Sequence, residues 1–336
     1  MAKFKVYYTI ELNEVATHIF ESNDFEVKLC SHNDEETYVK ELAEFQPDAI
    51  MCRTEPITAK MMDTCKNLKV IGKQGAGLDN IDMDHAHAKD ITVVYAPAGN
   101  ANAVAEHAVM LMLMCAKRFT YVDRQFRGGN FLVRMGMEHT YELGGKTLGM
   151  IGCGRISQLA MQKCKYGFGM NVIGYDPYLT QDKIGDLCEL KATAKEVWEQ
   201  ADFVSVHLPV VPSTEHSIGR EQFSWMKPTA SFINCARGAL IKENELVECL
   251  KDGTLFQAGL DVFEHEPIQE SSRELFNLDN VIMTPHMAAT TEQSVLNCCT
   301  SVANDIVAVC NGQEPKVKAQ TVSYTHLRAH ETLMNL

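Results

Sequence analysis

Short apolar runs rich in β-branched residues alternate with helical stretches over most of the chain. In the first hundred residues these runs are FKVYYTI (4–10), FEVKLC (25–30), DAIMC (48–52), LKVIGKQG (68–75) and TVVYAP (92–97). Apolar runs separated by helical segments indicate parallel βα units, which build α/β domains. The alternation therefore predicts a parallel sheet in this part of the chain.

A second series of runs follows a long helix predicted over 101–119, which is apolar nearly all round. Such a helix is usually buried between domains or subunits. The later runs are KTLGMIGCG (146–154), MNVIGYDP (170–177), DFVSVHLP (202–209), ASFINCA (230–236), FQAGLDVF (256–263) and VIMTPH (281–286). Each ends in polar or turn residues, and ligands of open α/β sheets bind outside those ends. A last helix is predicted over roughly 288–311, stopping at Asn311-Gly312.

Length and charge limit the class of protein. A chain of 336 residues is long enough for two domains. Its net charge of −13 argues against nucleic acid or an anionic membrane as the main partner. The longest apolar run, Ala108–Ala116, is too short to span a bilayer, and the first ten residues do not resemble a signal peptide. We therefore expect a cytoplasmic protein.

The 12 cysteines show no spacing typical of a zinc site, and we expect buried thiols in a reducing compartment. The segment VSYTHLRAHET, residues 322–332, resembles an in-frame translation of a transposase adaptor used in sequencing libraries. We expect 322–336 to be a non-native tail and the natural C-terminus to be absent.

A dinucleotide site is predicted at GMIGCGRIS, residues 149–157. Gly152 and Gly154 come directly after an apolar strand and before a helix, where glycines let a pyrophosphate approach the helix N-terminus. The third position of the GxGxxG pattern is Ser157, which makes the motif weak by itself. Asp176 follows Gly154 by 22 residues, where an acid accepts hydrogen bonds from the adenosine ribose. A carboxylate there repels a 2′-phosphate and favours NAD over NADP.

The stretch GLDVFEHEP (259–267) places three carboxylates and a histidine within six positions. By itself it is compatible with a metal site, a catalytic acid/base pair or a solvated loop. Arg237 in INCARGALI and His286 in VIMTPHMAA follow two other late predicted strands. Together with Glu266, they lie beyond strand ends on the predicted cofactor side.

With these motifs in order, the chain resembles the D-isomer-specific 2-hydroxyacid dehydrogenases, close to the phosphoglycerate dehydrogenase group. The resemblance runs from about residue 40 to 315. Its motifs are GAGLDNID (75–82), VAEH (104–107), ELGGKTLGMIGCGRI (142–156), VHLP (206–209), CARG (235–238), DVFEHEP (261–267) and TPH (284–286).

The resemblance implies an α/β fold with two Rossmann-like, doubly wound parallel-sheet domains. The substrate domain is expected at 1–100 and 289–321, and the inserted NAD-binding domain at 101–288. The long apolar helix is expected to support a homodimer. Since no regulatory domain follows residue 315, feedback through such a module is not expected.

The residue types suit the reduction of a 2-oxo acid by NADH. A histidine near neutral pKa can supply the proton, which is the role expected for His286. Glu266 would hold that ring, and the Arg237 guanidinium would bind a carboxylate and polarise the adjacent carbonyl. Some relatives, such as formate dehydrogenases, carry glutamine beside the histidine and need no proton transfer; Glu266 argues against that activity.

The resemblance also assigns binding residues. In the substrate site we expect Arg53, Arg237 and the backbone N–H groups of Ala76 and Gly77, where Arg53 could equally be a loop residue that holds the domain together. Asp261 is expected to face the nicotinamide carboxamide, and Glu264 and His265 to face solvent. No metal is expected. The expected NAD contacts are Gly152, Gly154, Arg155, Ile156, Asp176, His207, Pro209, Cys235, Ala236, Arg237, Asp261, His286 and Ala288.

The substrate remains open among 3-phosphoglycerate, glycerate or hydroxypyruvate, glyoxylate and lactate-type acids. A different class also remains: some relatives are NAD(H)-sensing corepressors that bind peptide motifs and keep the same three polar residues. The discriminating observation is turnover of a 2-oxo acid, as opposed to NADH-dependent peptide binding without turnover.

Overall fold

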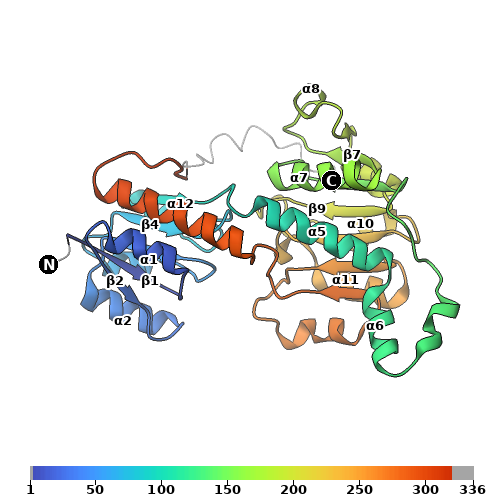
Figure 1. The fold of residues 1–336 in the computed structure, drawn as a ribbon, viewed down its shortest axis with the longest axis horizontal. Coiled ribbons are helices and arrows are strands. Elements are labelled where there is room, and N and C mark those ends of the chain that lie inside the picture. The colour runs from blue at the N-terminus through green and yellow to red at the C-terminus, as the bar shows by residue number, and fades with distance from the viewer. Residues whose placement is uncertain (1–2, 320–336) are drawn as a thin grey trace. The chain divides into compact units, whose positions relative to one another are not determined.

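The computed structural model describes residues 3–319, which form two compact units (Figure 1). Unit 1 comprises residues 3–100 and 289–319, and unit 2 comprises residues 101–288. The predicted non-native tail, 322–336, lies outside the described residues. Within the described part of the chain, no helix is long and apolar enough to cross a membrane.

Unit 1 contains a five-stranded parallel sheet in the order β2-β1-β3-β4-β5. Each strand lies within a run predicted from the sequence, so all five predictions are confirmed. The strands are β1 (Phe4–Tyr8), β2 (Phe25–Leu29), β3 (Ala49–Cys52), β4 (Val70–Lys73) and β5 (Thr92–Tyr95).

Helices cover both faces of this sheet because successive side chains of a strand point to opposite sides. On β1, Val6 and Tyr8 belong to the core shared with α1 (Glu14–Glu21) and α12 (Glu292–Cys310). Tyr7 points the other way, into the core shared with α2 (Glu35–Phe45), α3 (Ala59–Thr64) and α4 (Met83–Ala88). Both cores are apolar, so the strands read as continuous hydrophobic runs.

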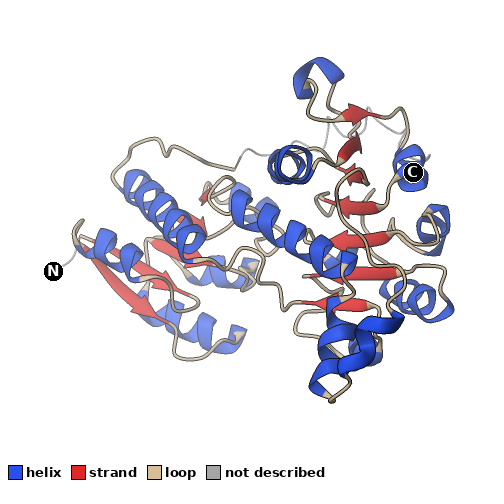
Figure 2. Cartoon of the chain, turned by 45° about the vertical axis from the view of Figure 1, so that its right-hand side comes forward, coloured by secondary structure: helices blue, strands red, loops and turns tan. Residues whose placement is uncertain are grey.

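Unit 2 contains a seven-stranded parallel sheet in the order β12-β11-β10-β9-β6-β7-β8. Figure 2 shows helices on both sides of these strands. Six strands match predicted runs, and β8 was missed. They are β6 (Thr147–Ile151), β7 (Asn171–Tyr175), β8 (Glu189–Leu190), β9 (Phe203–Val206), β10 (Ser231–Asn234), β11 (Gln257–Leu260) and β12 (Val281–Met283).

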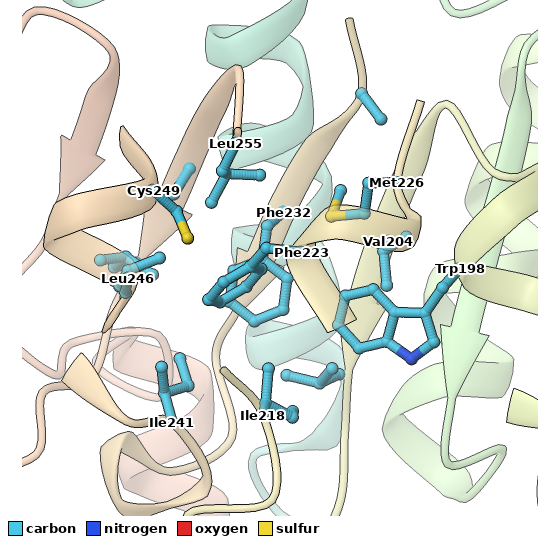
Figure 3. Packing of buried hydrophobic residues seen from close by; sticks show 14 of the residues in the cluster. Trp198, Val204, Ile218, Phe223, Met226, Phe232, Ile241, Leu246, Cys249 and Leu255 are labelled. Carbon is cyan, nitrogen blue, oxygen red and sulfur yellow. The ribbon is translucent and has the colours of Figure 1, made fainter. Parts of the chain in front are cut away.

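One face of this sheet is covered by α9 (Ala194–Gln200), α10 (Arg220–Trp225) and α11 (Glu243–Asp252). Trp198 stacks on Phe232 of β10, and Phe223 meets the same ring edge to face (Figure 3). Offset and edge-to-face aromatic pairs add roughly 0.5–1.5 kcal/mol each beyond the area they bury. The two doubly wound sheets confirm the predicted α/β class.

The opposite face of the unit 2 sheet carries α5 (Ala101–Ala116), which packs closely enough that a Cβ on Gly259 would lie 3.0 Å from the Leu111 Cβ. The predicted helix over 101–119 is therefore present but ends earlier. Arg118 has a φ of 49°, in the left-handed region, and this residue separates α5 from α6 (Phe119–Arg127). Remaining short elements of unit 2 are η1 (Phe131–Gly136), α7 (Arg155–Gln162), η2 (Lys163–Gly167), α8 (Gln181–Ile184), η3 (Gly238–Leu240) and η4 (Glu270–Asn277).

The last helix, α12, begins later than predicted because Thr291 caps it: its hydroxyl accepts a hydrogen bond from the Ser294 N–H. The predicted stop is confirmed, since Asn311 is the C-cap and Gly312 follows with a φ of 74°.

Backbone segments approach closely at Gly238, the first residue of η3. A Cβ at this position would overlap the carbonyl group of Phe263 and the backbone nitrogen of Glu264. Because backbone cannot give way as a flexible side chain does, only glycine fits here. This approach fixes the segment after β10 against the segment after β11.

We predict that Gly238→Ala destabilises the protein by about 3 kcal/mol or more, because the new methyl must displace backbone. Thermal unfolding should then occur roughly 6–12 °C lower. Gly167→Ala is the matched control, since nothing lies within 4 Å of its added Cβ. Equal melting temperatures for the two variants would contradict the close approach.

Candidate active site

The predicted cofactor and catalytic residues of unit 2 lie along one edge of its sheet. All strands run parallel, so their carboxyl ends share that edge. The strand order reverses between β6 and β9, and α/β sheets bind ligands at such a switch point. From one end of the sheet to the other, the edge carries His286 after β12, Asp261 and Glu266 after β11, Arg237 after β10, His207 after β9, Gly152 after β6 and Asp176 after β7.

The glycine loop after β6 has the shape that a pyrophosphate needs. Gly152 has a φ of 86°, and a Cβ there would lie 2.7 Å from the backbone oxygen of His207. At Gly154 an added Cβ meets nothing within 4 Å, so space is open directly before α7. Arg155 and Ile156 form the first turn of that helix, whose N–H groups favour an anion. The loop therefore fits a dinucleotide.

Ser157 occupies the third position of the glycine motif and is fully buried. Its hydroxyl donates a hydrogen bond of 2.6 Å to the backbone oxygen of Gly152. Serine here keeps the close packing of helix and strand and adds a bond that holds the loop, which explains why the incomplete motif still forms the turn.

Asp176 lies directly after β7, beside the same loop. One carboxylate oxygen accepts a hydrogen bond of 2.9 Å from the Cys153 N–H, and the other accepts one of 2.9 Å from the Tyr178 N–H. These bonds fix the carboxylate at the edge of the sheet where the ribose of a dinucleotide is expected.

His207 and Pro209 follow β9, next to the glycine loop. The His207 Nε2 atom lies 2.9 Å from the Ser205 hydroxyl. Desolvation lowers the pKa of His207 to about 4, so this ring is neutral at physiological pH. A neutral ring can line a cofactor site but does not suit the role of proton donor.

The loop after β10 is shaped by Asn234, which sequence reasoning did not single out. Its side chain accepts a hydrogen bond of 2.9 Å from the Ala236 N–H and donates one of 2.9 Å to the backbone oxygen of Arg237. The Arg237 guanidinium donates to the Ala236 oxygen at 2.7 Å. Burial raises the pKa of the neighbouring Cys235 thiol, so this thiol stays protonated.

His286 and Glu266 are in direct contact, as predicted. The His286 Nδ1 atom lies 2.6 Å from a Glu266 carboxylate oxygen, and each side chain is 34% exposed. The other Glu266 oxygen accepts a hydrogen bond of 3.0 Å from the Phe263 N–H. The carboxylate thus contacts the ring through Nδ1, and Nε2 is the ring nitrogen outside this contact.

Asp261 is fully buried, and its carboxylate holds the segment after β12. It accepts hydrogen bonds from the Thr284 hydroxyl at 2.6 Å, the Met287 N–H at 2.9 Å and the Ala288 N–H at 2.8 Å. This role was not predicted for Asp261, and its nicotinamide contact stays a prediction. Thr284 also contacts His107 of α5, a residue whose only sequence signal was its place in the VAEH motif.

The prediction that Glu264 faces solvent was wrong. Glu264 is partly buried, and its carboxylate lies 2.8 Å from His216 Nε2 and accepts a bond from the Glu243 N–H at 3.4 Å. Glu243 in turn accepts a bond of 2.9 Å from the Glu264 N–H. This reciprocal pairing joins α11 to the GLDVFEHEP segment. His265 is exposed, as predicted.

In unit 1, the predicted substrate residues follow neighbouring strands of the other sheet. Arg53 lies after β3, and its guanidinium donates a bond of 2.7 Å to the Thr290 hydroxyl. Ala76 and Gly77 lie after β4, both partly buried, and Gly75 before them has a φ of 149°. The Arg53 bond to Thr290 supports the loop-holding alternative.

No group of three or more His, Cys, Asp or Glu side chains within residues 3–319 is placed to hold a metal ion. The four polar residues of GLDVFEHEP separate into different contacts: Asp261 to the 284–288 segment, Glu264 to α11, Glu266 to His286, and His265 exposed.

Comparisons with known proteins agree with this geometry. Residues 109–288 match the family described as D-isomer specific 2-hydroxyacid dehydrogenase, NAD binding domain. The chain is 39% identical over 311 residues to D-3-phosphoglycerate dehydrogenase of Methanocaldococcus jannaschii, covering 92% of this chain and 58% of the relative. It is 36% identical over 296 residues to hydroxypyruvate reductase of Thermotoga maritima, covering 88% of this chain and 94% of the relative.

Among solved structures, the D-lactate dehydrogenase of Aquifex aeolicus, complexed with NAD and lactic acid, superposes with a TM-score of 0.81. Its sequence is 26% identical, and the match covers 92% of this chain and 96% of that one. The chain belongs to the D-isomer specific 2-hydroxyacid dehydrogenase family. Its cofactor is NAD, bound by the domain that the family description names.

We predict that Asp176→Ala lowers the preference for NADH over NADPH by roughly 10- to 100-fold, because a carboxylate that repels the 2′-phosphate is removed. Dissociation constants for both nucleotides, measured by fluorescence titration, give the ratio. Tyr178→Ala, which leaves the carboxylate in place, is the control. An unchanged ratio in Asp176→Ala would contradict the ribose assignment.

Proposed function

We propose that the chain catalyses hydride transfer between NAD(H) and a 2-oxo or 2-hydroxy acid. The observation that carries this proposal is the contact of 2.6 Å between His286 and Glu266, at the sheet edge that also carries Arg237 and the glycine loop. The chain spans 58% of the length of its Methanocaldococcus relative, so its activity is inferred from these residues.

In the reducing direction, NADH supplies the hydride that reaches the carbonyl carbon. His286 gives a proton from Nε2 to the carbonyl oxygen, and Glu266 stabilises the protonated ring by accepting the Nδ1–H bond. The proton returns to Nε2 from solvent after product release. In the oxidising direction the same ring accepts the hydroxyl proton.

Arg237 binds the substrate carboxylate, because a guanidinium offers paired donors to two oxygens. We assign Ala76, Gly77 and Arg53 to the substrate side, with the two backbone N–H groups facing the carboxylate. An arginine at position 53 suits a substrate with a second anionic group. The relatives named D-3-phosphoglycerate dehydrogenase and hydroxypyruvate reductase make a phosphoglycerate-type or a hydroxypyruvate/glyoxylate-type acid the proposed substrate class.

We predict that His286→Ala lowers kcat by roughly 10²- to 10⁴-fold, the usual contribution of a general acid, while the Kd for NADH changes by about twofold or less. The assay follows NADH oxidation with 3-phosphohydroxypyruvate, hydroxypyruvate, glyoxylate and pyruvate. His265→Ala is the matched control, since this exposed histidine is expected to keep wild-type turnover.

Two results would contradict the proposal. Loss of turnover in His265→Ala but not in His286→Ala would reverse the assignment. Absence of NADH oxidation by the wild-type chain with every acid of the panel would remove the proposed activity. NADH-dependent peptide binding without turnover would then favour the corepressor-like alternative.

We also propose that the protein is a cytoplasmic homodimer, with the contact formed by α6 and η1. The α5 helix expected to support the dimer buries most of its apolar residues within unit 2. Large apolar side chains are exposed beyond it: Phe119 (49%), Phe126 (57%), Phe131 (59%), Leu132 (67%) and Met135 (76%). An exposed apolar cluster of this size on a folded protein usually marks an interface.

We predict that the wild-type chain has twice the monomer mass in light scattering, and that Leu132→Asp with Met135→Asp yields a monomer. A charge buried in an apolar interface is costly, whereas the same charge in water is not. Leu296→Asp on α12, where the leucine is 46% exposed, is the control and should leave the dimer intact. A monomeric wild type would contradict this interface.

A further inference from the structure

The backbone of His286 is held in a conformation that non-glycine residues rarely adopt. Its φ is 50°, in the left-handed region. The direction of the imidazole depends on this backbone, because the side chain leaves from the same Cα. Contacts around residue 286 must therefore keep the chain from relaxing to negative φ.

Asp261 supplies these contacts to three consecutive residues. Its backbone oxygen accepts a hydrogen bond of 2.7 Å from the His286 N–H. Its carboxylate accepts bonds from the Met287 N–H at 2.9 Å and the Ala288 N–H at 2.8 Å. Asp261 is fully buried, so its carboxylate and backbone oxygen lie away from bulk solvent.

The orientation of the Asp261 carboxylate is in turn set by Thr284 and His107. The Thr284 hydroxyl directs its single hydrogen to the Asp261 carboxylate at 2.6 Å. The His107 Nε2 atom lies 2.8 Å from the Thr284 oxygen and 3.4 Å from the Asp261 carboxylate. Since the threonine hydrogen is already used, Nε2 of His107 must carry the hydrogen and donate it.

The protonation state of His107 suits this donor role. Burial lowers the pKa of His107, although the Asp261 carboxylate beside it acts in the opposite direction. The ring is therefore neutral at physiological pH, with its one hydrogen on Nε2. The other polar side chains of α5, Asn102 and Glu106, are exposed. His107 is partly buried and lies among the apolar residues that α5 buries.

We propose that His107 is a positioning residue for the proton donor: through Thr284 and Asp261 it holds His286 in its left-handed backbone conformation and so aims the imidazole. The inference rests on the proposed function, because it takes His286 as the group that exchanges the proton. His107 does not touch the reacting atoms and acts through a chain of hydrogen bonds from α5 to the segment 284–288.

The test breaks the chain of hydrogen bonds at two positions, and a third variant restores the N–H donor at position 107. His107→Leu removes the ring, and Thr284→Val removes the hydroxyl that relays its bond. His107→Gln keeps an N–H donor at a similar distance from the backbone. Met112→Val removes buried volume from the same helix, where Met112 is fully buried, and serves as the control for general destabilisation.

We expect kcat to fall roughly 10- to 100-fold in His107→Leu and Thr284→Val, with KM for the 2-oxo acid and Kd for NADH changed by about twofold or less. His107→Gln should restore kcat to within about fivefold of the wild type. Hydrogen exchange of the peptide covering 284–288, measured without substrate or cofactor, should accelerate by about tenfold or more in the first two variants.

Wild-type kcat together with wild-type exchange in His107→Leu and Thr284→Val would overturn the proposal. An equal fall of kcat in Met112→Val at the same loss of melting temperature would also overturn it, since the effect would then be general destabilisation. Failure of the proposed function is distinguishable: the wild-type chain would show no turnover, and the exchange measurement would still decide whether His107 holds the segment.

Discussion

Parallel strand pairing is the constraint on which the site depends. In the unit 2 sheet the pairs β6–β9, β9–β10 and β10–β11 all run in the same direction, so every strand delivers the residue that follows it to one edge. Asp176 and His286 lie far apart in the sequence, yet they share this edge. A single reversed strand would place its following residue at the opposite edge of the sheet.

Much of the fold could be predicted because strands buried on both faces read as uninterrupted apolar runs. The two-residue strand β8 (Glu189–Leu190) carries no such run and was missed. The early end of α5 was missed for a different reason. Lys117 and Arg118 are good helix formers, and no glycine or proline in the sequence marks the left-handed φ of Arg118.

Within the site, sequence spacing indicated which residues follow strands but not how side chains pair. The contact of His286 with Glu266 was predicted through the family resemblance, and the structure contains it. The pairing of Glu264 with Glu243 depends on how α11 packs, and the bond between His107 and Thr284 joins residues 177 positions apart. Such pairs arise from tertiary packing, which local patterns do not encode.

Within residues 3–319 the chain passes between the two units after Asn100 and after Ala288. Unit 2 begins with α5, which contains His107. It ends at Ala288, two residues after His286. The His107–Thr284 bond therefore ties the two connections together within unit 2. One hydrogen-bonded cluster therefore holds both the first helix of unit 2 and the last residues of that unit.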